Sequence, residues 1–341
     1  MQEKHKSRAT GKVTLADVAR LADVSPITVS RVVNTPDKVA KASREKIERA
    51  IDELGYIPNR AAKALATSKT NTIAVLIPSV AHGVFSAVTK GIYDSCTASN
   101  YEVIFANSYY SILHEEKLLL KLLSMAPDGV IVTGLDLSER IVKRLKNAAI
   151  PVVQIMDVGH ADPLDMNIGF SHFTAGASMA RHLAERGYQK IGFIGAQMGG
   201  RSQRRLRGFL AALAHAGINA SDWTVTSKEA ISVALGGQLL GQLLERVPQL
   251  DAVFCSSDEL AFGAIYEAQR RGIEIPSQLA IAGFNDLDGA QAINPGLTTI
   301  RTPLYQIGRQ AATLLLRKLD GEDIVDKVLD LGTELVVRQS T

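Results

Sequence analysis

This chain of 341 residues is poor in the groups from which disulfide frameworks, metal sites and membrane spans are built. Its two cysteines, Cys96 and Cys255, have apolar neighbours, no CxxC spacing and no flanking histidines, so both are expected to be buried thiols of a cytoplasmic protein. No run approaches the roughly 18 apolar residues that a membrane helix needs. Residues 1–12 are polar and basic, without the apolar core of a secretory signal, and are expected to form a flexible basic arm.

Catalytic motifs are missing as well. The sequence has no GxSxG elbow, no P-loop and no HExxH pair, and its seven histidines form no cluster with metal-ligand spacing. The segment GAQMGG at 195–200 lacks the order of glycines that a dinucleotide site requires. The sequence therefore predicts neither an enzyme nor a bound cofactor or metal.

What the chain does contain is an uneven distribution of charge. Hydrophobic residues make up 46% and charged residues 21%, as in a globular protein, and the net charge is only +3. Residues 1–70 carry 14 Lys and Arg against 8 Asp and Glu, whereas the rest of the chain carries 24 against 27. A basic module on a slightly acidic body indicates a polyanionic partner at the N-terminal end.

The basic module begins with the signals of two short helices. Thr14 can cap a first helix, with Asp17 three residues on, and Asp23 tolerates the left-handed turn that follows it. Ser25 is a strong N-cap, and Pro26 suits the first position of a second helix. Two short helices joined by a tight turn form a helix-turn-helix, whose second helix can enter the major groove of DNA.

The inward faces of these helices predict a small core, closed by a third helix from about Ser43 to Leu54. The outward face of the second helix offers short hydroxyl side chains and one arginine, Arg31. An ordinary three-helix bundle without a role in DNA binding is the alternative. The candidate core residues are Leu15, Val18, Ala19, Ala22, Val29, Val32 or Val33, Ile47, Ala50, Ile51 and Leu54.

Two stretches of this module carry a resemblance to a known family. VTLADVARLADVSPITVSRVVN (13–34) and REKIERAIDELGYIPNRAAKAL (44–65) closely resemble the headpiece of the lactose/galactose (LacI-type) repressor family. The resemblance implies that Pro26 and Ile27 occupy the two main specificity positions and that Arg31 reads a base, with guanine its expected partner. The DNA contacts that it implies are Thr14, Ser25, Pro26, Ile27, Thr28, Ser30, Arg31, Asn34, Asn59, Ala62, Lys63 and Leu65.

The segment from Tyr56 to Leu65 resembles the hinge helix of this family, with Pro58 at its start. So short a helix is not stable alone, and it is expected to fold only when two copies pack together on bent DNA. Leu65 then resembles the apolar wedge that opens the central base step through the minor groove. A marginal helix between two rigid bodies would act as a switch; an inert linker is the alternative.

From residue 71 onward, short apolar segments alternate with helical patterns. Segments such as TIAVLIP (72–78), GVIVTG (129–134) and KIGFIG (190–195) are of the buried-strand type, which predicts parallel sheets covered by helices on both faces. The predicted fold is an all-α helix-turn-helix headpiece followed by an α/β body of two Rossmann-like lobes, similar to periplasmic binding proteins. The predicted domains are a helix-turn-helix domain at 13–57, a hinge helix and linker at 58–70, and an effector-binding and dimerisation domain at 71–341, with an N-lobe at about 72–166 and 300–325 and a C-lobe at about 167–299 and 326–341.

Ligands of open parallel sheets bind beyond the carboxyl ends of the strands, which defines a set of candidate effector residues. Arg205 could hold a carboxylate with two hydrogen bonds, and surface charge is the alternative for this residue. The family resemblance implies effector contacts at Asp157, Arg205, Ser257 and Asn285 in particular. The full set predicted to bind the effector is Ser79, Phe85, Gly134, Asp157, Arg205, Ser257 and Asn285.

Within the family, the chain most resembles the gluconate-type repressors, in YIPNRA, VVQIMD, QLDAVFCSSDELAFGA and AIAGF. This resemblance implies a gluconate-like sugar acid as the effector. One cationic group among several hydroxyl and amide groups also fits a keto-gluconate or a sugar phosphate nearly as well. A neutral sugar, a purine and a co-repressor in place of an inducer remain alternatives, as does a sugar-binding protein without a regulatory role.

The partners expected from the resemblance are a pseudo-palindromic double-stranded DNA operator, the small effector and a second copy of the chain. The segments 73–97 and 101–124 of the first lobe are the implied dimer faces. The last residues, ELVVRQST, contain no leucine heptad of the kind that builds a four-chain bundle, so a dimer is favoured. No membrane partner is expected.

Overall fold

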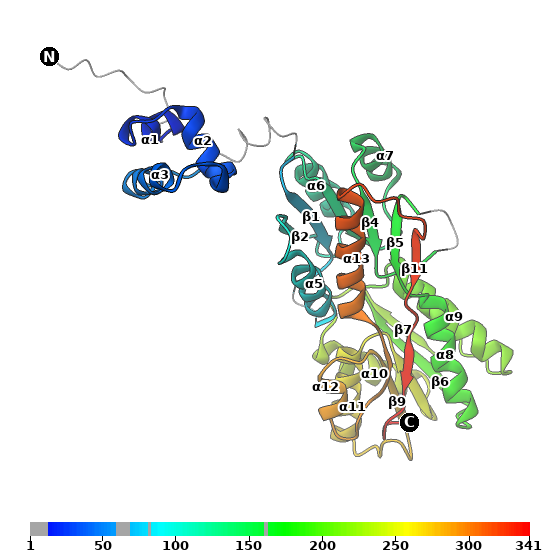
Figure 1. Ribbon diagram of the computed structural model, residues 1–341. Helices are drawn as coiled ribbons and strands as arrows, with labels where there is room; N and C mark the ends of the chain where they lie inside the picture. The colour runs from blue at the N-terminus through cyan, green and yellow to red at the C-terminus, as the bar shows by residue number, and fades with distance from the viewer. Residues whose placement is uncertain (1–12, 59–68, 81–82, 160–162) are drawn as a thin grey trace. The chain divides into compact units, whose positions relative to one another are not determined.

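The computed structural model describes residues 13–58, 69–80, 83–159 and 163–341. The chain divides into two compact units, residues 1–70 and 71–341, and each is described by itself (Figure 1). The predicted basic arm and most of the predicted hinge helix, including Asn59, Ala62, Lys63 and Leu65, lie outside the described residues.

The first unit contains three α-helices, α1 (Leu15–Leu21), α2 (Pro26–Asn34) and α3 (Lys41–Leu54), with a 3₁₀ turn at Pro36–Lys38. The predicted local signals are confirmed. Thr14 and Asp17 form a capping box, Asp23 has a φ of 48° at the turn, and the side chain of Ser25 caps α2. These contacts use polar groups that each helix start would otherwise leave without partners.

The core of this unit is small and contains one residue, Tyr56, that is absent from the predicted core. Val18, Val29 and Ile47, one from each helix, are fully buried. Tyr56 is 9% exposed and packs against the same core, which agrees with the predicted domain at 13–57 but not with a hinge-like segment that begins at Tyr56. A core this small depends on each of its contacts, so the residues after α3 belong to the folded headpiece as far as Tyr56.

The second unit contains two six-stranded sheets, one in each lobe. In the first the order is β11-β5-β4-β3-β1-β2 and every pair is parallel; in the second it is β12-β10-β9-β8-β6-β7, with only the β10–β12 pair antiparallel. The strands of the first sheet are β1 (Thr72–Ile77), β2 (Glu102–Asn107), β3 (Gly129–Thr133), β4 (Val152–Ile155), β5 (Met166–Gly169) and β11 (Val328–Asp330). Those of the second are β6 (Ile191–Ala196), β7 (Thr224–Ser227), β8 (Ala252–Cys255), β9 (Ala280–Asn285), β10 (Thr298–Arg301) and β12 (Glu334–Val336).

Helices cover both faces of each sheet, as the buried strand pattern predicted. In the first lobe α5 and α13 pack on one face and α6 and α7 on the other, and in the second α8 and α9 lie opposite α10 and α11 (Figure 1). The two Rossmann-like lobes are therefore confirmed. The helices are α5 (Gly83–Cys96), α6 (Ile112–Leu123), α7 (Glu139–Ala148), α8 (His172–Glu185), α9 (Gly200–His215), α10 (Val233–Arg246), α11 (Asp258–Arg270), α12 (Gly289–Ala292) and α13 (Leu304–Leu319).

The lobe boundaries differ from those predicted. Strand β5 pairs with β4, so the first lobe extends past residue 166, and β10 pairs with β9, so the second lobe extends past residue 299. Strand β11, predicted in the C-lobe, pairs with β5 in the first sheet. The chain thus crosses between lobes after β5, after β10 and after β11, and short strands alone do not reveal which sheet they join. Strand β7 and the four-residue helix α12 were not predicted, because both are short and carry little periodic signal.

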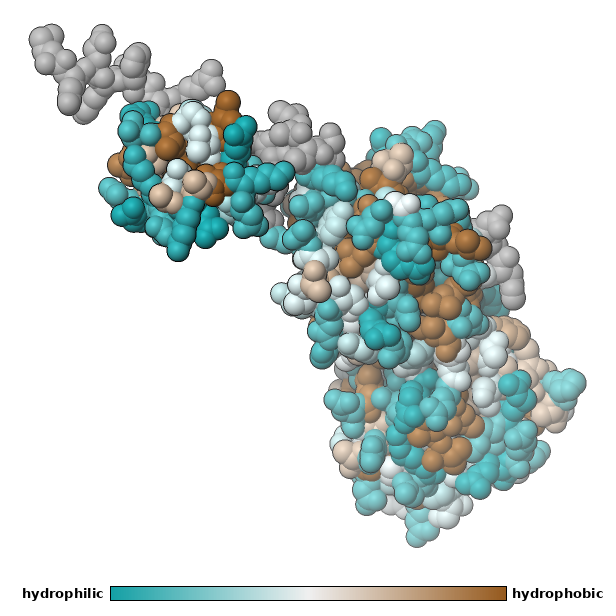
Figure 2. Space-filling model, in the orientation of Figure 1, coloured by the Kyte–Doolittle hydropathy of each residue, from teal (hydrophilic) through white to brown (hydrophobic). Residues whose placement is uncertain are grey.

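The visible surface of the body mixes hydrophilic and apolar residues (Figure 2). On the face of the body seen in Figure 2, apolar residues form separate patches among hydrophilic ones. Among the described residues, no helix combines the length and apolar character needed to cross a membrane.

The start of α3 yields a first prediction. Ala40 is its N-cap and provides no side-chain hydrogen bond, so Ala40→Ser is expected to stabilise α3 by about 1 kcal/mol. Hydrogen exchange of the α3 amides in the full chain would measure this change. The exposed Ala42, one residue inside the helix, is the control position, since Ala42→Ser adds the same hydroxyl where it cannot cap. Equal exchange rates in the Ala40→Ser and native chains would contradict the expectation.

Candidate functional site

The outward face of α2 presents the predicted reading residues to solvent. Pro26, Ile27 and Arg31 are exposed, and Ile27 is 66% accessible despite being a large apolar residue. Val29 and Val32 on the opposite face are buried. An exposed isoleucine beside an exposed proline has no folding role in this unit, which is consistent with apolar contact to a base edge such as a thymine methyl group.

The hydroxyl and amide groups of this region are within hydrogen-bond distance of one another. Ser25 Oγ lies 2.8 Å from Thr28 Oγ1, and Asn34 Nδ2 donates to the carbonyl of Ser30 at 2.9 Å. Thr14, at the start of α1, is exposed. Short polar side chains held in this way can face a phosphate backbone with little further loss of conformational freedom.

Arg31 differs from several other cations of the headpiece because it has no ion-pair partner among the described residues. Its side chain makes no hydrogen bond or ion pair with any described residue, whereas Arg20, Arg44 and Lys46 each lie within 4.0 Å of an acidic side chain. A guanidinium that is exposed and unpaired is free to donate two hydrogen bonds to a guanine edge. The geometry of α2 is therefore suited to reading a major groove.

In the second unit, a cavity of about 230 Å³ lies between the lobes. Its lining comes from the carboxyl ends of the strands of both sheets, with Pro78 and Gly134 following β1 and β3, and Gln197, Ser257 and Asn285 at or after the ends of β6, β8 and β9. This is where ligands of open parallel sheets bind.

The structure brings together five of the seven residues predicted to bind the effector. Phe85, Gly134, Arg205, Ser257 and Asn285 line the cavity. Asn285 has a φ of 117°, a conformation rare for a residue with a side chain and concentrated at functional sites. The other two, Ser79 and Asp157, are buried and do not line the cavity.

Arg205 is held mainly by the protein itself. Its Nη1 donates to the carbonyl of Ser256, its Nη2 lies 3.1 Å from His172 Nδ1, and its guanidinium stacks 3.4 Å from the centroid of Phe284. His172 Nε2 lies 2.9 Å from the carbonyl of Met156, so Nε2 carries the proton and Nδ1 accepts from the arginine. Both terminal nitrogens of Arg205 are thus used. Arg205 was predicted to donate two hydrogen bonds to a ligand carboxylate. In the structure only its Nε lacks a partner among the described residues, so only this nitrogen is available to a ligand.

Burial has a strong electrostatic effect on this pair. It lowers the pKa of Arg205 to about 9, with the nearby guanidinium of Arg201 adding to the effect. Burial, and secondly the positive charge of Arg205, hold the pKa of His172 well below its usual value. His172 is therefore neutral at pH 7, which is the state that can accept a hydrogen bond from Arg205.

Arg201 is the residue that sequence reasoning missed. It lines the cavity one helical turn before Arg205 on α9, and its guanidinium lies 5.8 Å from the centroid of the Phe85 ring. Among the described residues it has no hydrogen bond or ion pair, and burial lowers its pKa. The spacing of four residues puts Arg201 and Arg205 on one helical face, and this spacing is the signal that could have found it.

Besides the two arginines, the cavity contains hydrogen-bond acceptors and hydroxyl groups. Glu115 and Glu259 supply carboxylates, and Tyr110, with a φ of 57°, supplies a phenol. Gln197 Oε1 and Ser256 Oγ are buried polar atoms without a partner among the described residues. Cations, acceptors and hydroxyls around so small a volume suit a compact ligand with several hydroxyl groups and an anionic group.

Asp157, for which an effector contact was predicted, does not line the cavity and pairs with a neighbouring arginine. It is fully buried, and its Oδ2 accepts a hydrogen bond from Arg204 Nε at 2.8 Å. Burial raises the pKa of this carboxyl group, which the charge of Arg204 partly opposes. Asp157 is therefore paired with Arg204, an arginine of α9 that does not line the cavity.

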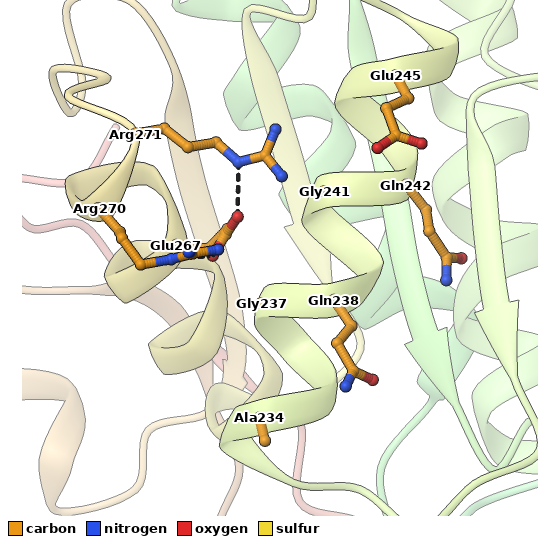
Figure 3. Close-up of a pocket in the computed structure, with 9 residues that line it drawn as sticks. All are labelled: Ala234, Gly237, Gln238, Gly241, Gln242, Glu245, Glu267, Arg270 and Arg271. Carbon is orange, nitrogen blue, oxygen red and sulfur yellow. Dashed lines mark hydrogen bonds and ion pairs between the residues drawn. The ribbon is translucent and has the colours of Figure 1, made fainter.

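A larger hollow, of about 420 Å³, lies on the second lobe between α10 and α11. Gly237 and Gly241 form part of it, and Glu267 lies beside both Arg270 and Arg271 (Figure 3). Glu267 accepts hydrogen bonds from both arginines at 2.6 Å, so its carboxylate offsets one of the two positive charges and both guanidinium groups have a partner within the protein. None of the described residues that line this hollow belongs to a strand, and we assign the candidate ligand site to the smaller cavity between the lobes.

Comparisons with known proteins identify relatives of both the headpiece and the body. Residues 14–59 match the model of bacterial regulatory proteins of the lacI family, and residues 180–341 match that of a periplasmic binding protein-like domain. The HTH-type transcriptional regulator GntR of Pseudomonas aeruginosa is 41% identical over 335 residues, which cover 98% of this chain and 97% of that protein. Within the described residues, no group of three or more His, Cys, Asp and Glu side chains could hold a metal ion.

Solved structures are similar over nearly the whole chain. A LacI-family transcriptional regulator from Silicibacter pomeroyi has a TM-score of 0.90 at 35% identity, covering 96% of this chain and 99% of that one. The lac repressor dimer bound to its operator and the anti-inducer ONPF has a TM-score of 0.81 at 27% identity, covering 96% and 99%.

The buried histidine predicts a pH dependence of stability. The folded-state pKa of His172 is depressed, so the unfolded chain binds a proton below about pH 6.5 that the folded chain does not. The free energy of unfolding should therefore fall as the pH is lowered from 7 to 5, by at most about 1.4 kcal/mol per pH unit for this group. His182, whose pKa burial also lowers, acts in the same direction.

The measurement is denaturant unfolding of the full chain at pH 7 and pH 5. His172→Gln should lose part of the dependence, and His215→Gln, at an exposed histidine, should keep it. Comparing each variant with the native chain cancels the contribution of Asp258, whose raised pKa of about 6 has the opposite effect. An unchanged pH dependence in His172→Gln would be evidence against a neutral His172 in the folded chain.

Proposed function

Because this chain belongs to the lacI family of bacterial regulatory proteins, we propose that it is a repressor that leaves its operator when a gluconate-type sugar acid binds between its lobes. Regulators of this family bind operator DNA, respond to small-molecule effectors and are dimers, and they are not enzymes. The proposal concerns the chemical class of the effector, the direction of its effect and the residues that carry both activities.

The single observation that carries the sugar-acid proposal is the pair of arginines in the cavity, one of them without a partner. Burying a guanidinium costs free energy unless an anion or hydrogen-bond acceptors compensate for it. Arg205 has such acceptors in the protein, whereas Arg201 has none among the described residues. A carboxylate of the effector would supply them, with Arg205 Nε as a further donor.

The acidic residues of the cavity favour a carboxylate with one charge over a phosphate. Glu115 and Glu259 also line it, and a phosphate group with nearly two negative charges would be repelled more strongly than a carboxylate. Carboxylates also accept hydrogen bonds from sugar hydroxyls, which a neutral sugar would use equally well. The face of Phe85 is near Arg201, which leaves less room for stacking a purine ring.

The regulatory step is a coupling between the cavity and the headpiece. An effector can shift the body only toward the arrangement that it binds better, and that arrangement must bind the operator less well for release to follow. An effector that prefers the operator-bound arrangement would act as a co-repressor instead. We propose release by an inducer, with the hinge segment from Pro58 onward as the element that the body displaces.

On the DNA side we propose that α2 reads the major groove, with Arg31 on a guanine and with Pro26 and Ile27 setting specificity by apolar contact. Ala62, Lys63 and Leu65 are proposed to act in the minor groove near the dimer axis, and Asn59 is proposed to contact the sugar-phosphate backbone. The remaining contacts, Thr14, Ser25, Thr28, Ser30 and Asn34, are proposed to position the headpiece on phosphates.

Arg31→Ala tests the reading helix. The variant should lose about 1–3 kcal/mol of discrimination between operator and unrelated DNA, because a two-bond contact to guanine is lost. Titration of both duplexes at one fixed salt concentration measures it. Lys38→Ala, at another exposed cation of the headpiece, is the control and should weaken binding to both duplexes alike. Full discrimination by Arg31→Ala would refute the assignment.

Arg201→Met tests the effector proposal. Loss of a charged hydrogen-bond partner should reduce the affinity for gluconate by about 1.5–3 kcal/mol and remove most of the thermal shift that gluconate causes. Arg207→Met, on an exposed arginine of the same helix, should retain the shift. The native chain is screened in parallel with gluconate, keto-gluconates, a neutral sugar, a sugar phosphate and a purine. A full gluconate shift in Arg201→Met would move the carboxylate elsewhere, and a shift by purine or neutral sugar alone would overturn the sugar-acid class.

A further inference from the structure

We propose that Arg204 and Asp136 form a latch between the lobes that holds them in a closed arrangement before any effector arrives. Arg204 does not line the cavity, but it lies on α9 directly before Arg205 and one turn after Arg201. It is thus a positioning residue: it holds the helix that carries both cavity arginines against the first lobe.

The geometry of the latch joins two lobes through one side chain. Arg204 Nη1 and Nη2 donate to Asp136 Oδ1 and Oδ2 at 2.9 and 2.8 Å, while Nε donates to Asp157 Oδ2 at 2.8 Å. Asp136 follows β3 and Asp157 follows β4, both at the carboxyl edge of the first sheet, whereas α9 belongs to the second lobe. The guanidinium donates two hydrogen bonds to one carboxylate and uses its remaining edge for the second. This arrangement fixes both the distance and the orientation between α9 and the first lobe.

The backbone is shaped to allow this close approach. Gly200, the first residue of α9, leaves room for the carboxylate: a Cβ built there would lie 2.1 Å from Asp136 Oδ2. A side chain at position 200 would therefore require the carboxylate of Asp136 to move from the position in which Arg204 holds it.

The two arms of the latch differ in how easily they open. The side chain of Asp157 is 1% exposed and that of Asp136 is 53% exposed. Breaking a buried pair by removing one partner strands a charge and is strongly destabilising, whereas an exposed pair contributes about 0–1 kcal/mol. Asp157 therefore anchors Arg204 permanently, and Asp136 is the arm that can release. The hydrogen bonds from Arg204 also hold the pKa of Asp136 below its usual value, so this carboxylate stays ionised.

The latch affects binding through the population of the closed state. If only the closed arrangement presents Arg201 and Arg205 together with Gly134 of the first lobe, the apparent affinity falls in proportion to the closed fraction. A weak ion pair suits this task, because a change of about 1 kcal/mol shifts a two-state population severalfold without endangering the fold.

The test measures the distance between the lobes in the full chain without any ligand. Spin labels are attached at Asn147→Cys on α7 and His215→Cys at the end of α9, both exposed positions on different lobes. The native Cys96 and Cys255 are buried and remain unlabelled. Labelled chains are mixed with excess unlabelled chains, so that the measured distances lie within one chain.

Asp136→Asn keeps the shape of the side chain and leaves the Arg204–Asp157 pair intact. It should add a longer-distance population to the ligand-free distribution while changing the melting temperature little. Glu322→Gln breaks an exposed pair of similar geometry between Arg317 on α13 and the segment directly after that helix, and it should leave the distances unchanged. Native distances in Asp136→Asn would overturn the proposal, as would the same broadening in Glu322→Gln.

Adding gluconate separates this inference from the proposed function. Restoration of the short distance in Asp136→Asn by gluconate would support the latch and the sugar-acid effector together. Because Asp136 also lines the cavity, gluconate is tested on the native chain in parallel. A longer distance in Asp136→Asn, together with no thermal shift of the native chain by gluconate, would support the latch and count against the sugar acid. A melting temperature that falls steeply in Asp136→Asn would mean that the pair supports the fold itself, and it would overturn the latch as a positioning device.

Discussion

The buried guanidinium of Arg205 is the constraint on which the body depends. A cation in the interior must find acceptors, and here they are a backbone carbonyl after β8, a neutral histidine at the start of α8 and an aromatic face. That histidine is in turn fixed by the carbonyl of Met156 at the end of β4. One side chain thereby ties the carboxyl ends of strands in both sheets to α9, and the cavity between the lobes takes its shape from this tie.

Around this fixed point the neighbouring arginines of α9 have different roles. Arg205 is used within the protein, Arg204 pairs with carboxylates of the first lobe, and Arg201 reaches the cavity without a partner among the described residues. Three cations within two helical turns would repel one another if all faced the same acceptors. The three arginines avoid this repulsion because each faces different groups: Arg205 an internal network, Arg204 the carboxylates of the first lobe, and Arg201 the cavity. Since all three are on α9, a movement of this helix would affect all three contacts.

The headpiece is stabilised in a different way from the body. Its core consists of a few residues from three helices, and local signals such as the Thr14–Asp17 box and the Ser25 cap determine where α1 and α2 begin. The body instead depends on sheets covered on both faces and on a core that joins both lobes, with Phe170, Phe254 and Phe284 among its fully buried residues. A locally specified reader and a body that spans two lobes suit a protein in which the body controls the reader.

What the sequence determined by itself was local or periodic. Caps, the Asp23 turn, the buried strands and the helix-turn-helix depend on residues within a few positions of each other, so Thr14, Ser25 and the strand segments were assigned correctly. Strand ends also predicted the cavity at Gly134, Ser257 and Asn285. Only the tertiary structure decided which sheet each short strand joins, that Tyr56 belongs to the headpiece core, and how the arginines of α9 divide their partners. Those outcomes depend on contacts between residues far apart in the chain, such as Arg205 with Ser256 and Arg204 with Asp136, and spacing along the sequence does not encode them.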